Sequence, residues 1–200
     1  MARRAVLGAF AVALIASPPP TEDPNWPCQQ RLVPELSAAD YWSGPLNVQG
    51  DWQSDPQIAA LVRHLAPRSV TADEGLAAIA AFAASVSGDR SHRIALVFSG
   101  LLGETNRERA DLIERLKQIG RRQRELAALA ADLAGKLDAI PPDATGELGA
   151  ERTDLQQRHD FTARNFEEVQ RTIRYACEAP VSLDARLGTW ARALQTATQP

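Results

Sequence analysis

The residue types that most often carry catalysis or bind metals are scarce and scattered in this chain of 200 residues. It has three histidines, His64, His92 and His159, and one methionine, Met1. None of the histidines stands in the H-E-x-x-H or E-x-x-H spacing that helical metal sites use, and no C-x-x-C-H run is present to attach haem. A nucleophile elbow and a glycine-rich phosphate loop are also missing. The sequence therefore predicts no catalytic residue, no metal and no cofactor, and we expect a protein that is not an enzyme.

The N-terminal residues indicate whether the protein is exported, and export determines whether its two cysteines can form a disulfide. Residues 1–4 contain two arginines, residues 5–16 are apolar, and prolines follow. This order is typical of a secretory signal peptide, which we assign to residues 1–17, with a proline-rich linker over 18–27. An uncleaved tether is the alternative. The apolar run is too short to span a bilayer and no later stretch qualifies, so we expect a periplasmic or secreted protein with no transmembrane segment after signal removal.

Cys28 and Cys177 are the only cysteines. In an exported chain, two cysteines predict one disulfide, which would join an extended N-terminal strap, expected over residues 26–37, to the base of a helical hairpin. Two separate buried thiols are the alternative. The net charge is −3 and becomes more negative when Arg3 and Arg4 are removed, which argues against nucleic acid as a partner.

Two heptad seams are the main secondary-structure signal in the sequence, and they predict the pair of helices that position His159 and Cys177. Apolar or small residues recur with alternating steps of four and three on both sides of a Pro- and Gly-containing breaker at residues 141–146, which predicts an antiparallel, coiled-coil-like hairpin over residues 105–178. The register places Leu133 opposite Leu155 and Ala130 opposite His159. The expected seam residues are Leu112, Leu116, Ile119, Gln123, Leu126, Ala130, Leu133, Leu137 and Ile140, then Leu148, Arg152, Leu155, His159, Thr162, Phe166, Val169, Ile173 and Ala176.

Local capping signals predict the remaining helices. Asp55-Pro56 starts one helix, and the capping box at residues 71–74 starts an alanine-rich helix that we expect inside the bundle. A third begins near Ser91, and its register favours a continuous or gently kinked path into the hairpin despite two glycines. Pro180 is expected to break the chain, with Ser182 capping a last helix. The class is all-α, with one helical domain over residues 28–200.

Two groups of residues have the composition of binding surfaces. Trp26, Trp42 and Trp52 crowd near the strap, where they either seal it onto the helices or form a docking surface. A basic run consists of Lys117, Arg121, Arg122 and Arg124. Cross-hairpin ion pairs with Glu167 and Glu168 explain most of that run, and an anionic partner is the alternative. Residues 106–109 are interpreted as a solvated helix face.

The first residues of the mature chain carry a motif of the form W-P-C-x-Q-x-x-V-P-x-L-S at residues 26–37, followed by Trp42 and Gly44-Pro45. This opening resembles that of a group of uncharacterised exported bacterial proteins. The later Arg121-Arg122-Gln123 and a cysteine near the end are similar too. The resemblance implies export and a shared helical fold, and it implies no activity and no functional residue.

Two functions fit these observations. The first is an exported interaction or scaffold protein, an accessory subunit that binds another cell-envelope protein or associates with itself through the hairpin. The second is a small-ligand carrier or sensor, with a pocket between the alanine-rich helix and the hairpin near His92, Gln123 or His159. His159 is interpreted as a packed seam residue, and the alternative is a pH-sensitive joint.

Overall fold

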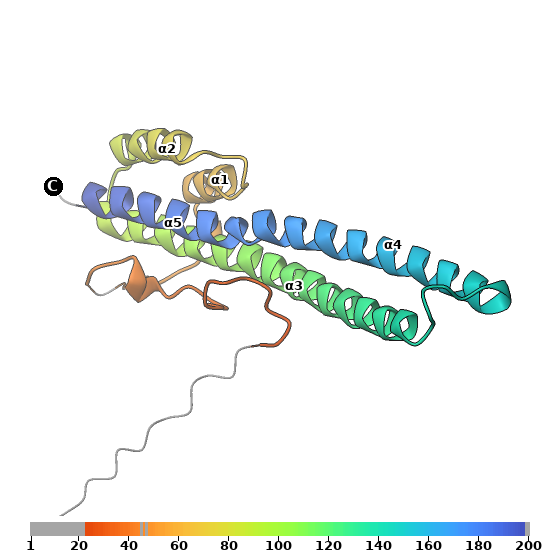
Figure 1. Ribbon diagram of the computed structural model, residues 1–200. Helices are drawn as coiled ribbons and strands as arrows, with labels where there is room; N and C mark the ends of the chain where they lie inside the picture. Colours follow the sequence, from red (N-terminus) through yellow and green to blue (C-terminus); the bar gives the residue numbers. More distant parts are fainter. Residues whose placement is uncertain (1–22, 45, 47, 199–200) are drawn as a thin grey trace, which may run out of the picture.

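The protein is an all-α bundle built around one long hairpin (Figure 1). The computed structural model describes residues 23–44, 46 and 48–198, so the expected signal peptide and the first part of the linker lie outside the described residues. Two short 3₁₀ turns precede five α-helices. The elements are η1 (Ala38–Asp40), η2 (Trp52–Ser54), α1 (Pro56–Leu65), α2 (Ala72–Ser85), α3 (Arg90–Asp138), α4 (Gly146–Ala176) and α5 (Glu178–Ala197).

Helix α3 continues without a break through Gly100 and Gly103, the two glycines at which the sequence alone left a kink possible. Its 49 residues span roughly 73 Å at 1.5 Å per residue. Gly100 is buried, and a Cβ there would lie 2.8 Å from Val62 and 3.0 Å from the Trp52 ring, so this glycine permits a close approach of side chains and does not end the helix. The expected continuity is confirmed, and the same helix serves both the body and the hairpin.

The hairpin turn follows the expected breaker. Gly146 has a φ of +64°, which glycine adopts easily. Arg152 reaches back to donate 2.7 Å hydrogen bonds to the carbonyls of Leu137, in the last turn of α3, and of Ile140, just after the helix. Leu133, Leu137, Ile140 and Leu155 form a separate small core at this end. The expected seam position of Leu148 is wrong: its side chain is 55% exposed, because Ala144 of the turn packs against this core instead.

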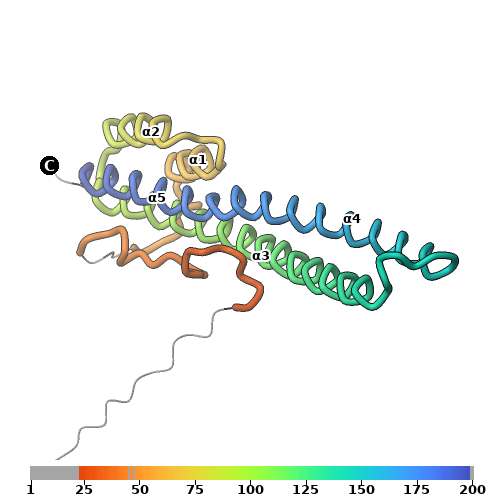
Figure 2. Tube along the Cα trace, in the orientation of Figure 1, coloured from red at the N-terminus to blue at the C-terminus, as the bar shows by residue number. Residues whose placement is uncertain are grey.

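The junction between α4 and α5 differs from the expectation. Only Cys177 separates the two helices, and α5 begins at Glu178, so Ser182 lies inside it and caps nothing. Pro180 is the third residue of α5. The first backbone N–H groups of a helix have no intrahelical partner, so a proline is tolerated there. The tube in Figure 2 follows α4 and α5 along the same side of α3, in nearly one line.

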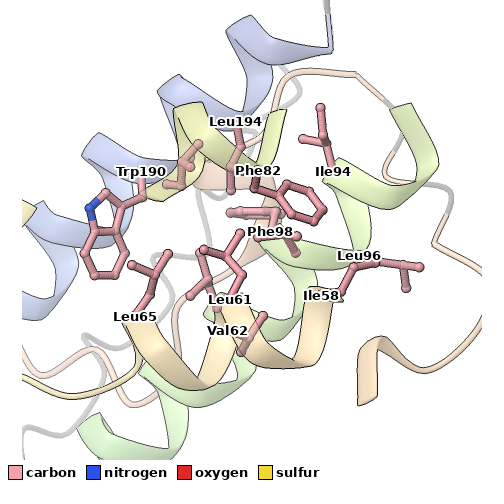
Figure 3. Packing of buried hydrophobic residues seen from close by; sticks show 14 of the residues in the cluster. Ile58, Leu61, Val62, Leu65, Phe82, Ile94, Leu96, Phe98, Trp190 and Leu194 are labelled. Carbon is pink, nitrogen blue, oxygen red and sulfur yellow. The ribbon is translucent and has the colours of Figure 1, made fainter. Parts of the chain in front are cut away.

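The main core lies where α1 and α5 pack on the first half of α3 and α2 packs on α5 (Figure 3). Asp55 caps α1, accepting hydrogen bonds from the Gln57 and Ile58 amides, and the Thr71–Glu74 capping box begins α2 as expected. The expected interior position of α2 is wrong. It packs mainly on α5, burying Ile79 and Phe82 while Ala77, Ala80, Ala81 and Ala84 remain exposed. A single buried stripe is enough to attach a helix to the edge of a bundle.

Candidate binding surfaces of the strap and the hairpin

A strap, residues 23–37, lies along α3 and is held by polar side chains of that helix. Asn106 forms a two-point clamp on Leu36: its Oδ1 accepts from the Leu36 amide at 2.9 Å, and its Nδ2 donates to the Leu36 carbonyl at 3.0 Å. Arg109 donates to the carbonyls of Val33 at 2.8 Å and Pro180 at 2.6 Å. Arg109 is only 5% exposed, so the interpretation of residues 106–109 as a solvated face is wrong for this residue.

The start of the strap is held by two residues of the expected basic run. Lys117 forms a 3.0 Å ion pair with Asp23, and Arg124 donates to the Pro24 carbonyl and the Asn25 side chain. A hydrogen bond from the Asn25 amide, followed by the Lys117 contact, lowers the pKa of Asp23. Residues 23–27, expected to be a poorly packed linker, are therefore docked on α3.

The expected cross-hairpin ion pairs from Arg121 and Arg122 to Glu167 and Glu168 are not formed within the described residues. All four side chains are exposed, and at such positions an ion pair contributes little.

Gly120 lets the strap approach the helix backbone. A Cβ at this position would overlap the carbonyl oxygen of Asn25. The strap-facing residues of α3 recur with steps of three and four, as a second stripe beside the heptad seam: Asn106, Arg109, Ile113, Lys117, Gly120 and Arg124. Because most of these residues are polar or glycine, hydrophobic periodicity does not reveal the stripe.

Replacing Gly120 by alanine is expected to release residues 23–27. Alanine favours a helix over glycine by about 1 kcal/mol, but the overlap with Asn25 costs roughly 1–3 kcal/mol, so the protein becomes less stable. Gly103→Ala is the matched control, because nothing lies within 4 Å of its Cβ and it should stabilise the same helix. Denaturant unfolding and amide exchange of residues 23–28 measure both effects. Equal stabilisation by the two substitutions would show that the strap does not lie against Gly120.

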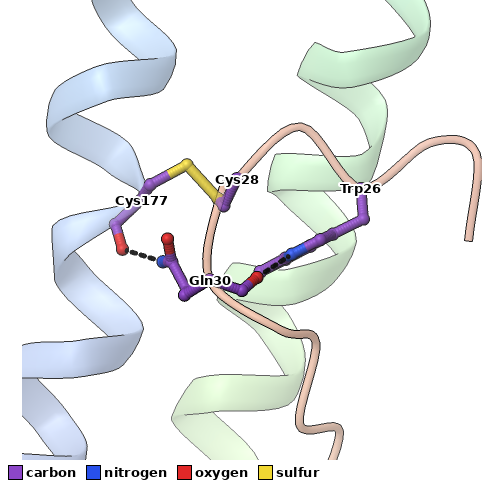
Figure 4. The surroundings of a disulfide bond; sticks show 4 residues. All are labelled: Trp26, Cys28, Gln30 and Cys177. Atoms are coloured by element: carbon purple, nitrogen blue, oxygen red, sulfur yellow. Dashed lines mark hydrogen bonds between the residues drawn. A yellow bond between two sulfur atoms is a disulfide. The ribbon is translucent and has the colours of Figure 1, made fainter. Parts of the chain in front are cut away.

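The predicted disulfide joins Cys28 to Cys177, with Cα atoms 5.7 Å apart. Figure 4 shows how the strap is fastened around it: the Gln30 side chain donates to the Cys177 carbonyl at 2.6 Å, and the Trp26 indole donates to the Gln30 carbonyl at 2.8 Å. The bond therefore joins the strap to the one residue between α4 and α5. This confirms the expected staple at the base of the hairpin.

The aromatic residues of the N-terminal segment are engaged within the protein. Trp42 stacks on Phe98 with ring centroids 4.8 Å apart, and Trp52 packs against the main core. Tyr41 donates a 2.5 Å hydrogen bond from its hydroxyl to Asp184. Burial, followed by the contact with Asp184, raises the pKa of Tyr41, so its phenol stays a donor. These contacts favour the interpretation that the aromatics attach the segment to the bundle.

A groove of about 800 Å³ lies beside the disulfide, between the strap, α3 and the α4–α5 junction. Gln123, Gln170, Arg174 and Glu178 contribute polar groups, and Ile173 contributes an apolar floor. Gln123, expected near a ligand pocket, lines this groove. His92 lines a different groove beside the start of α1, and α2 lines neither. His159 is half-buried on α4, with Nδ1 3.4 Å from Asp160 Oδ1.

The second exposed feature is an apolar groove of about 380 Å³ across the hairpin, named here the arm groove. Two large side chains on its rim are exposed, Leu129 by 43% and Phe161 by 60%. Leu126, Leu133 and Thr162 form the floor and are buried. Its remaining lining residues are Arg122, Arg158 and Asn165, so no carboxylate of the described residues lines the groove.

No group of three or more His, Cys, Asp or Glu side chains in the described part of the chain is placed to hold a metal ion. Among the same residues, no helix combines the length and apolar character needed to cross a membrane. No protein-family model, curated protein or solved structure matches this chain. The exposed surfaces of the strap and the hairpin are therefore the features that indicate a function.

Proposed function

We propose that the protein is an exported interaction subunit whose hairpin binds another envelope protein through the arm groove. The observation that carries the proposal is the exposure of Leu129 and Phe161 on a firmly packed helix pair. A large aromatic ring exposed by more than half, beside an apolar groove, is typical of a docking site. The small core at the hairpin end keeps this surface preorganised, which lowers the entropic cost of binding.

The charges beside the groove indicate the chemistry of the partner. Arg122 lines it and makes no ion pair among the described residues, while Arg158 pairs only loosely with Asp154, at 3.6 Å and with both side chains more than half exposed. An occupant with an apolar stripe flanked by carboxylates would pair with both arginines. We therefore assign the groove to an acidic amphipathic segment, bound as helices are bound in apolar grooves.

Export is supported by the disulfide, because such bonds persist in oxidising compartments. In the periplasm or outside the cell, a protein without a catalytic constellation can still act by holding another protein in place. Of the predicted partner-binding residues, Lys117 and Arg124 already contact the strap, whereas Arg122 lines the arm groove. The proposal is accordingly centred on Arg122, Arg158 and Phe161.

A photo-crosslinking amino acid at position 161, in cells that produce the protein, is expected to capture one partner through an acidic amphipathic peptide. The same probe at Tyr175, which is 76% exposed on α4 and outside the groove, is the matched control. With the purified partner, the double substitution Arg122→Glu and Arg158→Glu should weaken binding by about 10- to 100-fold, as expected for like charges placed opposite carboxylates.

Three outcomes would contradict this proposal. Crosslinks to a second copy of the chain would make the groove a self-association surface. Equal crosslinking of the partner from positions 161 and 175 would show that the partner has no preference for the arm groove. If both charge reversals left the affinity for the partner unchanged, in a protein that unfolds like the original, the two arginines would not pair with carboxylates of the partner.

A further inference from the structure

The groove of about 800 Å³ beside the disulfide gives small molecules access to the Cys28–Cys177 bond. Both cysteines line this groove, and each is half-buried. At roughly 30 Å³ for a water molecule, the volume holds more than about 20 water-sized groups, which is ample for a small thiol. Exposed disulfides undergo exchange with thiols more readily than buried ones. The groove therefore provides a route by which a thiol reaches the bond while the protein stays folded.

The disulfide lies outside both hydrophobic cores. Neither cysteine belongs to the main core or to the small core at the hairpin end. Beside the bond, the strap is held by hydrogen bonds from Trp26 to Gln30 and from Gln30 to Cys177 (Figure 4). Breaking the sulfur–sulfur bond therefore removes no core packing, and the helices are expected to remain folded.

Two sets of contacts with α3 hold the strap on either side of the bond. Lys117 and Arg124 hold residues 23–25 before it, and Asn106 clamps Leu36 after it. When the bond breaks, the segment between these anchors is free to leave α3 while its two ends stay attached. The two thiols consequently remain near each other at high effective concentration, and the bond forms again in an oxidising compartment once the reductant is absent.

We propose that this groove is a thiol-exchange site, where a dithiol donor reduces the Cys28–Cys177 bond of the folded protein and releases the middle of the strap. One thiolate of the donor attacks the Cys177 sulfur, forms a mixed disulfide there and displaces the Cys28 sulfur as a thiolate. The second donor thiolate attacks the donor sulfur of the mixed disulfide and displaces the Cys177 sulfur. The donor leaves as a disulfide, having passed two electrons to the protein, and the two protons of its thiols are taken up by the two cysteines.

The order of these steps follows from what holds each cysteine. Cys28 leaves first because the strap is free to move, whereas Cys177 is fixed between α4 and α5. Arg174 and Glu178 line the groove on either side of Cys177 in the sequence, both are exposed, and neither forms an ion pair among the described residues. The positive charge attracts an attacking thiolate and the negative charge repels it. The exchange site is independent of the arm groove, because the two share no lining residue.

The rate at which dithiothreitol reduces the full-length oxidised protein tests whether exchange occurs in the folded state. The rate is expected to be proportional to dithiothreitol concentration and equal, within about twofold, in Trp190→Ala, whose site lies against α2 and outside the groove. If reduction required unfolding, this destabilised variant would react more than about 100-fold faster, and the proposal would be overturned. Low concentrations of urea repeat the test without a variant: the rate should stay flat, and a rise with the slope of global unfolding would overturn the proposal.

The charges beside the groove give a second test. Arg174→Gln should slow reduction by about two- to fivefold, and Glu178→Gln should accelerate it by a similar factor, as expected for exposed charges. Arg171→Gln is the matched control, because Arg171 is exposed on the same helix and does not line the groove. Equal rates in all three variants would overturn the groove as the route of attack.

Trapping the intermediate identifies the sulfur that is attacked. Glutathione has one thiol, so it is expected to leave a mixed disulfide on Cys177 and a free Cys28 that alkylation marks for mass spectrometry. An adduct confined to Cys28 would overturn the assigned order. Reduced thioredoxin, which carries its dithiol on a folded domain, distinguishes the source of the thiol: reduction as fast as with dithiothreitol assigns a protein donor, and reduction by dithiothreitol alone assigns a small-molecule donor.

Discussion

Replacing Trp190 by alanine is expected to lower the free energy of unfolding by about 3–5 kcal/mol. The side chain is 1% exposed and fills the space between α5 and α2. Its indole N–H donates to the Ala72 carbonyl at 3.1 Å, and the Arg186 guanidinium lies 4.7 Å from the ring centroid. A Cβ on Gly75 would overlap the ring, so α2 has no side chain of its own with which to fill the cavity that alanine would leave.

Denaturant unfolding of the variant checks this expectation, with Tyr175→Ala as the control. Tyr175 is 76% exposed, and its removal should change stability by no more than about 0.5 kcal/mol. Amide exchange should rise first in α2, because this helix depends mainly on α5 for its contacts. A loss of less than about 1 kcal/mol on Trp190→Ala would mean that α2 collapses onto α5 and fills the space, contrary to the packing argument.

The features predicted correctly from the sequence share one property: each follows from a local or periodic signal. The capping box at Thr71, the cap at Asp55 and the breaker before Gly146 act within a few residues. The seam depends on a repeat that a helix converts directly into one buried face, as the burial of Leu133 and Leu155 shows. The cysteine pairing required no geometry, because only one intramolecular pairing is available.

The strap contacts were not predictable in this way, because they depend on tertiary neighbours. Asn106 and Arg109 have the composition of a solvated face. Asn106 becomes half-buried and Arg109 buried, because the strap covers them and offers backbone groups to their side chains. The periodicity of apolar residues in a sequence indicates which helix face is buried by apolar side chains. It does not indicate that polar side chains such as these are buried. The same limit applies to Pro180, whose place in the first turn of α5 becomes clear only when the helix start is known.

The candidate surfaces were also predictable only in part, because some of their features depend on tertiary neighbours. The basic run was recognised as a group, but its members serve different purposes: Lys117 and Arg124 hold the strap, while Arg122 lines the arm groove. Phe161 stands one position before the seam residue Thr162, so its place outside the seam follows from the register. Its proximity to Leu129 could be found only from the packing of the two helices.

Replacing both cysteines by serine is expected to cost about 2–5 kcal/mol of folding free energy. The cysteines are 149 residues apart in the sequence, so the crosslink removes much of the freedom of the unfolded chain. The strap should nevertheless stay attached near Leu36, because the Asn106 clamp does not depend on the disulfide. Amide exchange should therefore rise more around residues 26–30 than around Leu36, and the midpoint of denaturant unfolding should fall.

The cysteine variant also tests whether the arm groove depends on the strap. The disulfide fastens the strap to the α4–α5 junction, where the Gln30 side chain donates to the Cys177 carbonyl. The arm groove is built from α3 and α4 alone and should keep its partner. The original protein treated with a reductant should behave like the double variant, and one in which only the buffer is changed should not. If partner binding were lost while the helices stayed folded, the disulfide would be setting the geometry of the whole hairpin, and the arm could not be treated as independent of the strap.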